Sequence, residues 1–412
     1  MAGPELASDA IHKAKTRRAP WSLLTLNFFM ADFQAGIGPF LGVFLLAHGW
    51  KSGLIGTVMT FGGVAGMLMS MPAGALIDQT RYKRACVIIA CFFTIAASTI
   101  VLLSQEFWVV AGSQMATAIA GAAIVPAVNG ITLGIVRQAG FNNQNGRNQA
   151  FNHAGNMVGS ALSGYAGWKF GYSAVFVIAA VFGILAILSV TLIPAASIDY
   201  AAARGLKEDG QDAKASGFTA LMECKPLLIL AVALAAFHLG NGAMLPLYGM
   251  GVVTEARSNG PSFVAMTIVV AQATMILASL VAMRMNETRG YWLVLLISFI
   301  ALPVRGLLAA YLIVPWGVYP VQILDGVGAG LQSVAVPGLV ARILNGTGRV
   351  NVGQGAVMGA QGLGAALSPL VGGGLAQEFG YPTAFVCLGL FALISIGLWL
   401  TSRNGASRTQ IS

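Results

Sequence analysis

The chain has 412 residues, of which 57% are hydrophobic and only 9% are charged, and its mean hydropathy is +0.77. Soluble domains carry about a quarter charged residues, so this composition excludes an ordinary soluble protein. The net charge of +9 could suit nucleic acid, but the basic residues gather in short loops between apolar stretches, which argues against such a partner.

Twelve apolar segments are each long enough to cross the hydrocarbon core of a bilayer, which is about 30 Å thick. We therefore predict an all-α polytopic membrane protein in contact with lipid along most of its length. The predicted spans are approximately 21–47, 53–77, 85–103, 107–136, 148–170, 172–193, 226–250, 261–283, 291–314, 316–343, 350–377 and 381–402.

The distribution of basic residues predicts the orientation. With the N-terminus in the cytoplasm, 19 of the 23 Lys and Arg residues fall on the cytoplasmic side and three on the other, while Arg305 lies inside a span. The positive-inside rule then places both tails, 1–20 and 403–412, in the cytoplasm of a protein of the inner (plasma) membrane. No cleavable signal is visible, and the four scattered cysteines form neither a disulfide framework nor a zinc motif.

Segment 194–225 is the only long polar stretch between spans, and it separates six spans from six. We predict a cytoplasmic loop joining two six-helix bundles, 21–193 and 226–402. The bundles share weak repeats at offsets of 207 to 209 residues: "FGYSAVF" at 170–176 returns as "FGYPTAF" at 379–385, and "QAGIGPF" at 34–40 corresponds to "NGAMLPL" at 241–247. Parallel repeats of this kind occur in secondary transporters.

Charged residues are concentrated in "GALIDQTRYKR", 74–84, after span 2, and a fainter copy, "RMNETRG", occupies 284–290. The first stretch resembles the signature of the major facilitator superfamily, roughly Gly-x-Leu-x-Asp-Arg-x-Gly-Arg-Lys/Arg-x, with departures at Gln79 and Tyr82. Span count, central loop and repeat extend the resemblance to the whole chain. It implies two pseudo-symmetric bundles that transport a solute by alternating access.

The resemblance also implies that this cluster is a cytoplasmic gate, in which charges hold one conformation and separate in the other. The alternative is that the basic residues only set the topology. The acid among the bases favours the gate, and the second copy has Asn286 in its place. The gate residues are Gly74, Asp78, Arg81, Lys83, Arg84 and Arg289.

An ionisable side chain inside a membrane span costs free energy, so such residues indicate functional sites. Asp32 and His238 lie at similar depths near the membrane midplane, and the resemblance places spans 1, 4, 7 and 10 around a central cavity. There Gln34 and Asn241 would join them, with Asp32 and His238 binding and releasing protons. The alternatives are that Asp32 caps a helix break near Pro39 and that His238 only bonds a carbonyl.

Arg305 and Asp325 fall at matching depths in spans 9 and 10, which predicts a buried ion pair. The pair is structural in one interpretation, since span 9 is peripheral in the family. In the other interpretation, Asp325 binds a proton or the substrate, and the charge of Arg305 modifies that binding.

Spans 4, 5 and 11 are rich in small residues and uncharged amides, which suit close helix packing and hydrogen bonding in lipid. We expect Asn129, Asn156, Gln332 and Gln361 at the cavity wall or between helices.

The leading hypothesis is a monomeric secondary transporter that moves a small organic solute, with proton-coupled efflux as the first choice. Proton-coupled uptake of a metabolite or siderophore is the alternative, because span 4 lacks the arginine usual in drug–proton antiporters of the family. Export of a divalent metal through Asp32 and His238 is a weaker possibility. No cofactor or resident metal is predicted, and neither a catalytic constellation nor an added soluble domain favours an enzyme or receptor.

Overall fold

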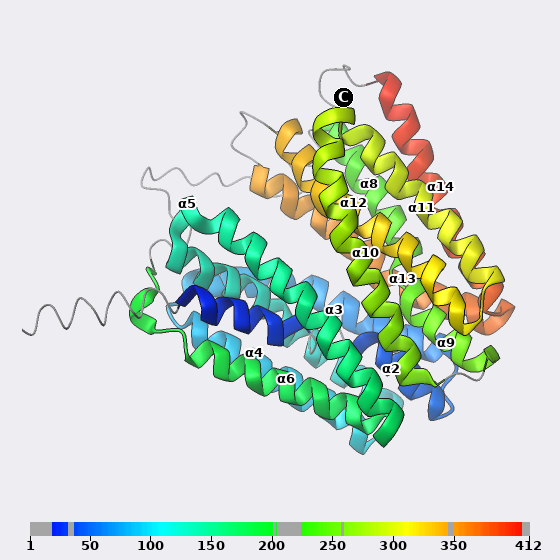
Figure 1. Cartoon of the computed structure of the whole chain (residues 1–412), viewed down its shortest axis with the longest axis horizontal. Coiled ribbons are helices and arrows are strands. Elements are labelled where there is room, and N and C mark those ends of the chain that lie inside the picture. The colour runs from blue at the N-terminus through cyan, green and yellow to red at the C-terminus, as the bar shows by residue number, and fades with distance from the viewer. Residues whose placement is uncertain are drawn as a thin grey trace, which may run out of the picture. The chain divides into compact units, whose positions relative to one another are not determined.

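The computed structural model describes residues 19–31, 37–200, 203, 224–256, 259–344 and 350–405, and all regular structure in these ranges is helical (Figure 1). The prediction of an all-α membrane protein is confirmed. Within the described ranges, nine helical segments are long and apolar enough to span a membrane. The other three predicted spans, the first, fifth and eleventh, are also helical along their described residues.

The structure forms two compact units. The first comprises the described residues of Met1–Ile37 and Leu68–Gln211, and the second those of Gly38–Met67 and Asp212–Ser412. Residues 38–67 thus group with the second unit, and the six-plus-six division at the central loop stays a prediction.

In the first unit, α4 packs against both α5 and α6 (Figure 1). Its elements are a helix at residues 19–31, the second part of α3 (Ser52–Gln79), α4 (Lys83–Leu103), α5 (Phe107–Phe170), α6 (Ser173–Thr191) and η1 (Ala195–Ser197). A core of buried aliphatic side chains such as Leu23, Val87 and Ile131 joins them.

Helix α5 contains two predicted spans. Its backbone leaves helical geometry at Arg137, where φ is 54° and ψ is −178°, in a region that non-glycine residues seldom adopt. Residues 138–147, which were expected to form a loop, are helical. Part of the reason is an amide chain: Gln144 donates to Asn148 at 2.9 Å, and Asn148 donates to Thr132 at 3.2 Å, so the buried amides of Gln144 and Asn148 are paired within the unit.

In the second unit, α10 packs on α12, α13 on α8, and α11 on both α12 and α14. Its elements are α2 (Ile37–Ala47), the first part of α3, α8 (Lys225–Asn241), α9 (Met244–Ala256), α10 (Gly260–Arg289), α11 (Tyr291–Tyr311), η3 (Pro315–Gly317), α12 (Val318–Ile343), α13 (Val350–Phe379) and α14 (Tyr381–Gly405).

Glycines allow these helices to touch backbone to backbone. A Cβ at Gly364 of α13 would collide with the carbonyl oxygen of Ala235 in α8, and one at Gly240 of α8 would collide with that of Leu388 in α14. In the first unit, Gly155 of α5 lies in the same way against Phe28. Helices in lipid associate through such close packing, because apolar side chains gain little from leaving the lipid.

Two tryptophans join α11 to α14. The Nε1 of Trp399 donates to the carbonyl of Trp292 at 2.9 Å, and the Nε1 of Trp292 donates to the carbonyl of Trp399 at 3.3 Å. Trp399 is completely buried, so its indole N–H has no access to water.

We expect Trp399→Phe to lower the free energy of unfolding by about 1–3 kcal/mol, because it removes a hydrogen bond and leaves a buried carbonyl with one donor fewer. Denaturant titration of the purified protein in micelles measures this loss. Trp316→Phe is the matched control, since Trp316 is exposed and its replacement should leave stability unchanged. Equal effects of the two substitutions would contradict the proposed role of the indole pair.

Candidate functional site

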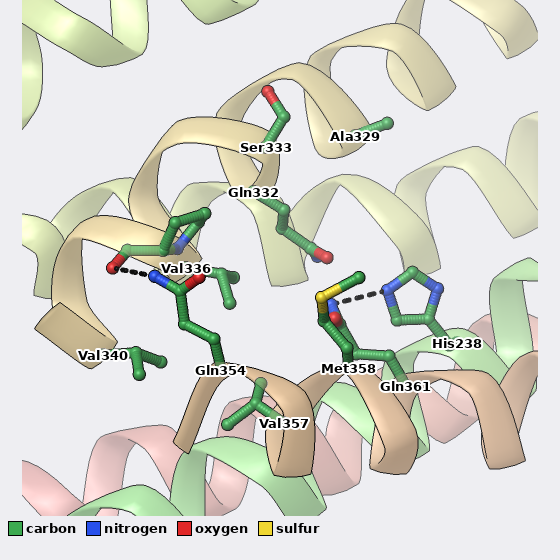
Figure 2. Close-up of a pocket in the computed structure, with 11 residues that line it drawn as sticks. His238, Ala329, Gln332, Ser333, Val336, Val340, Gln354, Val357, Met358 and Gln361 are labelled. Carbon is green, nitrogen blue, oxygen red and sulfur yellow. Dashed lines mark hydrogen bonds between the residues drawn. The ribbon is translucent and has the colours of Figure 1, made fainter. Parts of the chain in front are cut away.

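The second unit contains a cavity of about 290 Å³ between α8, α12 and α13 (Figure 2). This volume is near the lower limit, about 300 Å³, of pockets that bind small molecules. Eleven residues line it: His238, Ala329, Gln332, Ser333, Val336, Pro337, Val340, Gln354, Val357, Met358 and Gln361.

Helical periodicity explains why these residues converge. On α12, Ala329, Gln332, Val336 and Val340 follow one another at intervals of three or four residues and share one face. On α13, Gln354, Val357 or Met358, and Gln361 do the same. Figure 2 shows both stripes facing the same space, with His238 of α8 at one end of it.

The polar groups of the cavity are amides, an imidazole and a hydroxyl. The Nε2 atoms of Gln361 and His238 are 3.1 Å apart. An amide nitrogen can only donate, so the imidazole Nε2 accepts from it when the ring is neutral and carries its proton on Nδ1. Gln332 donates to the hydroxyl of Ser298 at 2.8 Å, and Ser298 donates to the carbonyl of Gly328 at 3.0 Å.

At the other end of the cavity, Gln354 reaches from α13 toward α12, and its amide lies 3.4 Å from the carbonyl oxygen of Pro337. The remaining wall is made of Val, Met, Ala and Pro side chains. The cavity can therefore hold an apolar body on these side chains and fix its orientation through a few amides.

Beyond the cavity, α8, α11 and α12 bury an ion pair. The Nη1 atom of Arg305 donates to the Oδ1 atoms of Asp325 at 2.7 Å and of Asn241 at 2.6 Å, and its Nη2 donates to Gln322 at 3.2 Å. Asn241 also approaches Asp325, at 3.4 Å. We call these four residues the Arg305 cluster.

The two charged side chains of the cluster differ in exposure. The side chain of Arg305 is 1% exposed and that of Asp325 is 13% exposed. The Nε of Arg305 and the Nε2 of Gln322 are buried without a hydrogen-bond partner in the structure. The guanidinium is thus fixed in the interior, while the carboxylate is the charged group that solvent can reach.

The cluster and the cavity occupy adjacent turns of the same helices. Asp325 precedes Ala329 by four residues on α12, and Asn241 follows His238 by three on α8, so each pair shares a helix face. A change at Asp325 therefore lies one turn away from the cavity wall.

The structure brings together only some of the residues expected at a central cavity. His238, Gln332 and Gln361 line the cavity, whereas Asn241 belongs to the Arg305 cluster. In the first unit, Asn129 is exposed and Asn156 is buried with its Oδ1 unpartnered. Asp32 and Gln34 lie outside the described residues.

Three residues of the site were missed from the sequence: Gln354, Gln322 and Ser298. Helical spacing could have indicated the first two, because Gln354 precedes Gln361 by seven residues and Gln322 precedes Asp325 by three. Ser298 had no such signal, since an isolated serine in an apolar helix is common.

The residues expected at a cytoplasmic gate fall into two groups. Lys83 is buried and donates to the carbonyl of Ile77 at the end of α3 at 2.6 Å. Arg84 donates to the carbonyls of Val190 and Thr191 at the end of α6, at 3.3 and 3.0 Å. The basic side chains of both therefore cap helix C-termini, where positive charge is favourable.

The other gate residues make fewer contacts. Arg81 and Arg289 are exposed, and a Cβ at Gly74 would meet nothing within 4 Å. The side chain of Asp78 is outside the described part of the structure. Among the described residues, no group of three or more His, Cys, Asp or Glu could hold a metal ion.

Comparison with known proteins extends the resemblance noted in the sequence. The family model of the Major Facilitator Superfamily matches residues 23–304 and 230–412. An uncharacterized MFS-type transporter from each of two strains of Mycobacterium tuberculosis is 36% identical over 388 residues, which cover 93% of both chains.

Solved structures show the same fold. A mutant of the nucleoside transporter NupG superposes with a TM-score of 0.79 at 15% identity, covering 93% of this chain and 99% of that one. A bacterial homolog of the human lysosomal transporter Spinster, inward-facing and occupied, gives a TM-score of 0.69 at 16% identity, covering 98% of both chains. This chain belongs to the Major Facilitator Superfamily and is a multi-pass membrane transporter.

Proposed function

We propose that the protein is a secondary active transporter that exports a small amphipathic organic solute in exchange for protons. The observation that carries this proposal is the position of the cavity, one helical turn from a partly exposed carboxylate paired with a buried arginine. Solute and proton would then bind to adjacent turns of α12.

The Arg305 cluster has the composition expected of a proton site. When Asp325 is protonated, the guanidinium of Arg305 loses its counter-charge but keeps two acceptors, Asn241 and Gln322. The positive charge therefore stays hydrogen-bonded while the carboxylate is released to take another position. Such a two-state arrangement lets proton binding bias the conformation of the surrounding helices.

The remaining assignments follow the sequence. Asp32 and His238 are further proposed proton groups, and Gln332 and Gln361 are proposed to contact the solute. The segment around Asp78 acts as the cytoplasmic gate. We place both termini in the cytoplasm, in the inner membrane, and propose that the monomer is the working unit.

Alternating access explains how these parts act together. The solute and the proton bind to sites that open to one side of the membrane at a time, so the gradient of one drives the movement of the other. Uptake of a metabolite is the alternative direction, and the same machinery would serve it. A nucleoside is a reasonable first test solute, because NupG is a nucleoside transporter and uridine is small enough for the cavity.

Radiolabelled uridine tests this proposal in membrane vesicles of both orientations with an imposed pH gradient. With export, acidifying the lumen of inverted vesicles should drive uridine accumulation at least several-fold above that of vesicles without the protein. A protonophore should abolish it. Accumulation only in right-side-out vesicles with acid outside would establish uptake instead, and flux that ignores the pH gradient in both orientations would refute proton coupling.

A further inference from the structure

The cavity wall contains no Asp, Glu, Lys or Arg among its lining residues. Every polar side chain among them is an amide, a hydroxyl or an imidazole, and the Nε2 of that imidazole lies 3.1 Å from the amide nitrogen of Gln361. The described charge nearest along a lining helix is the exposed Arg342, two residues beyond Val340 on α12. At the other end of α12, Arg305 and Asp325 neutralise each other at 2.7 Å. A charged solute that left water for this cavity would find no opposite charge among the lining residues, which is strongly unfavourable.

The amides provide both kinds of hydrogen bond. Gln332, Gln354 and Gln361 each use an amide nitrogen toward a protein group. The side chain of Gln332 is also hydrogen-bonded to His238, whereas no described group bonds the side-chain oxygens of Gln354 and Gln361. These oxygens can accept from a solute, and the hydroxyl of Ser333 can donate as well as accept. The Val, Pro and Met side chains between them suit a flat or compact apolar body.

We propose that this cavity selects an uncharged polar solute that carries both hydrogen-bond donors and acceptors, and rejects cations and anions of the same shape. The inference rests on the proposed transport function and specifies its substrate class. The size of the cavity restricts the solute to small-molecule dimensions.

A matched set of ligands separates charge from shape. Uridine is neutral, 5′-amino-5′-deoxyuridine replaces one hydroxyl by a protonated amine of nearly the same size, and uridine 5′-monophosphate is anionic. Nicotinamide and nicotinate form a second neutral and anionic pair. Binding is measured by equilibrium dialysis with the purified full chain, which does not depend on transport direction or coupling.

The neutral member of each set should bind saturably, and its charged counterparts at least tenfold more weakly. Gln361→Leu, which keeps the volume but removes donor and acceptor, should weaken neutral binding tenfold or more. Gln354→Glu, which adds a carboxylate to a lining that contains no Lys or Arg, should shift preference at least tenfold toward the aminonucleoside. Gln377→Glu is the matched control, because Gln377 is exposed near the far end of α13.

The proposal is overturned if a charged member binds wild-type protein as tightly as its neutral partner, if neither uridine nor nicotinamide binds, or if Gln354→Glu and Gln377→Glu have equal effects. Thermal unfolding of each variant verifies that it is folded. Binding of neutral members without any gradient-driven flux would refute the transport function while supporting the substrate class. Gradient-driven flux of the charged members would support the transport function and refute the substrate class.

Discussion

Asp325→Leu is expected to destabilise the protein by about 3–5 kcal/mol, because it leaves the fully buried guanidinium of Arg305 without a counter-charge. Arg305→Met should have a similar effect, since it leaves Asp325 unpaired. The double variant should regain most of the loss, because well-packed apolar residues often replace a buried ion pair at little cost. Denaturant titration in micelles provides the free energies for this double-mutant cycle.

Arg137→Met is the matched control for the cycle. Its ion pair with Asp199, at 3.2 Å, is exposed, with 74% of the Arg137 side chain accessible. Such surface pairs contribute less than about 1 kcal/mol. If Asp325→Leu were no more harmful than Arg137→Met, or if the double variant were as unstable as the sum of its single variants, the Arg305 cluster could not be a mutually dependent pair.

Gly364→Ala is expected to strongly disrupt the packing of the second unit. Its Cβ would collide with the carbonyl of Ala235, and backbone atoms of α8 cannot move without displacing the helix. Overpacking of this kind costs about 1–3 kcal/mol or more, against a gain of about 1 kcal/mol from the better helix propensity of alanine. Ligand binding should also weaken, because α13 positions Gln361, whose amide lies 3.1 Å from His238 of α8.

Gly362→Ala, two residues away on the same helix, isolates the packing effect. A Cβ there meets nothing within 4 Å, so only the propensity gain remains and stability should stay equal or rise. Thermal unfolding distinguishes the two variants. It is monitored as the loss of monodisperse protein on heating. Equal midpoints would show that α8 and α13 do not pack as closely as described.

Much of the fold was predictable because lipid imposes strong constraints. A span needs about 20 apolar residues, and its backbone must be helical, so segment lengths indicated the helices before their packing was known. Arg305 and Asp325 could be assigned to matching depths because an α-helix rises by a fixed length per residue. The predicted helix boundaries were wrong in polar segments. Residues 138–147 were predicted to form a loop but are helical, because the side chains of Gln144 and Asn148 form a hydrogen bond with each other within the protein.

The cavity was only partly predictable. His238, Gln332 and Gln361 are polar residues in apolar surroundings and were identified on that basis. Asn241 was expected beside His238 in the cavity, and the three-residue spacing does place them on one face, but Arg305 recruits Asn241 through a 2.6 Å hydrogen bond. Which polar residues share a partner depends on helix packing, and no feature of a single sequence specifies the packing.

The most direct test of proton coupling is the internal pH of proteoliposomes, followed with an entrapped pH indicator while an outward uridine gradient is imposed. Wild-type protein should change the internal pH as uridine moves. Asp325→Asn should exchange labelled for unlabelled uridine at a comparable rate, yet produce no pH change. An undiminished pH change with Asp325→Asn, or uridine movement without any pH change in wild-type protein, would contradict the coupling of the cavity to the Arg305 cluster.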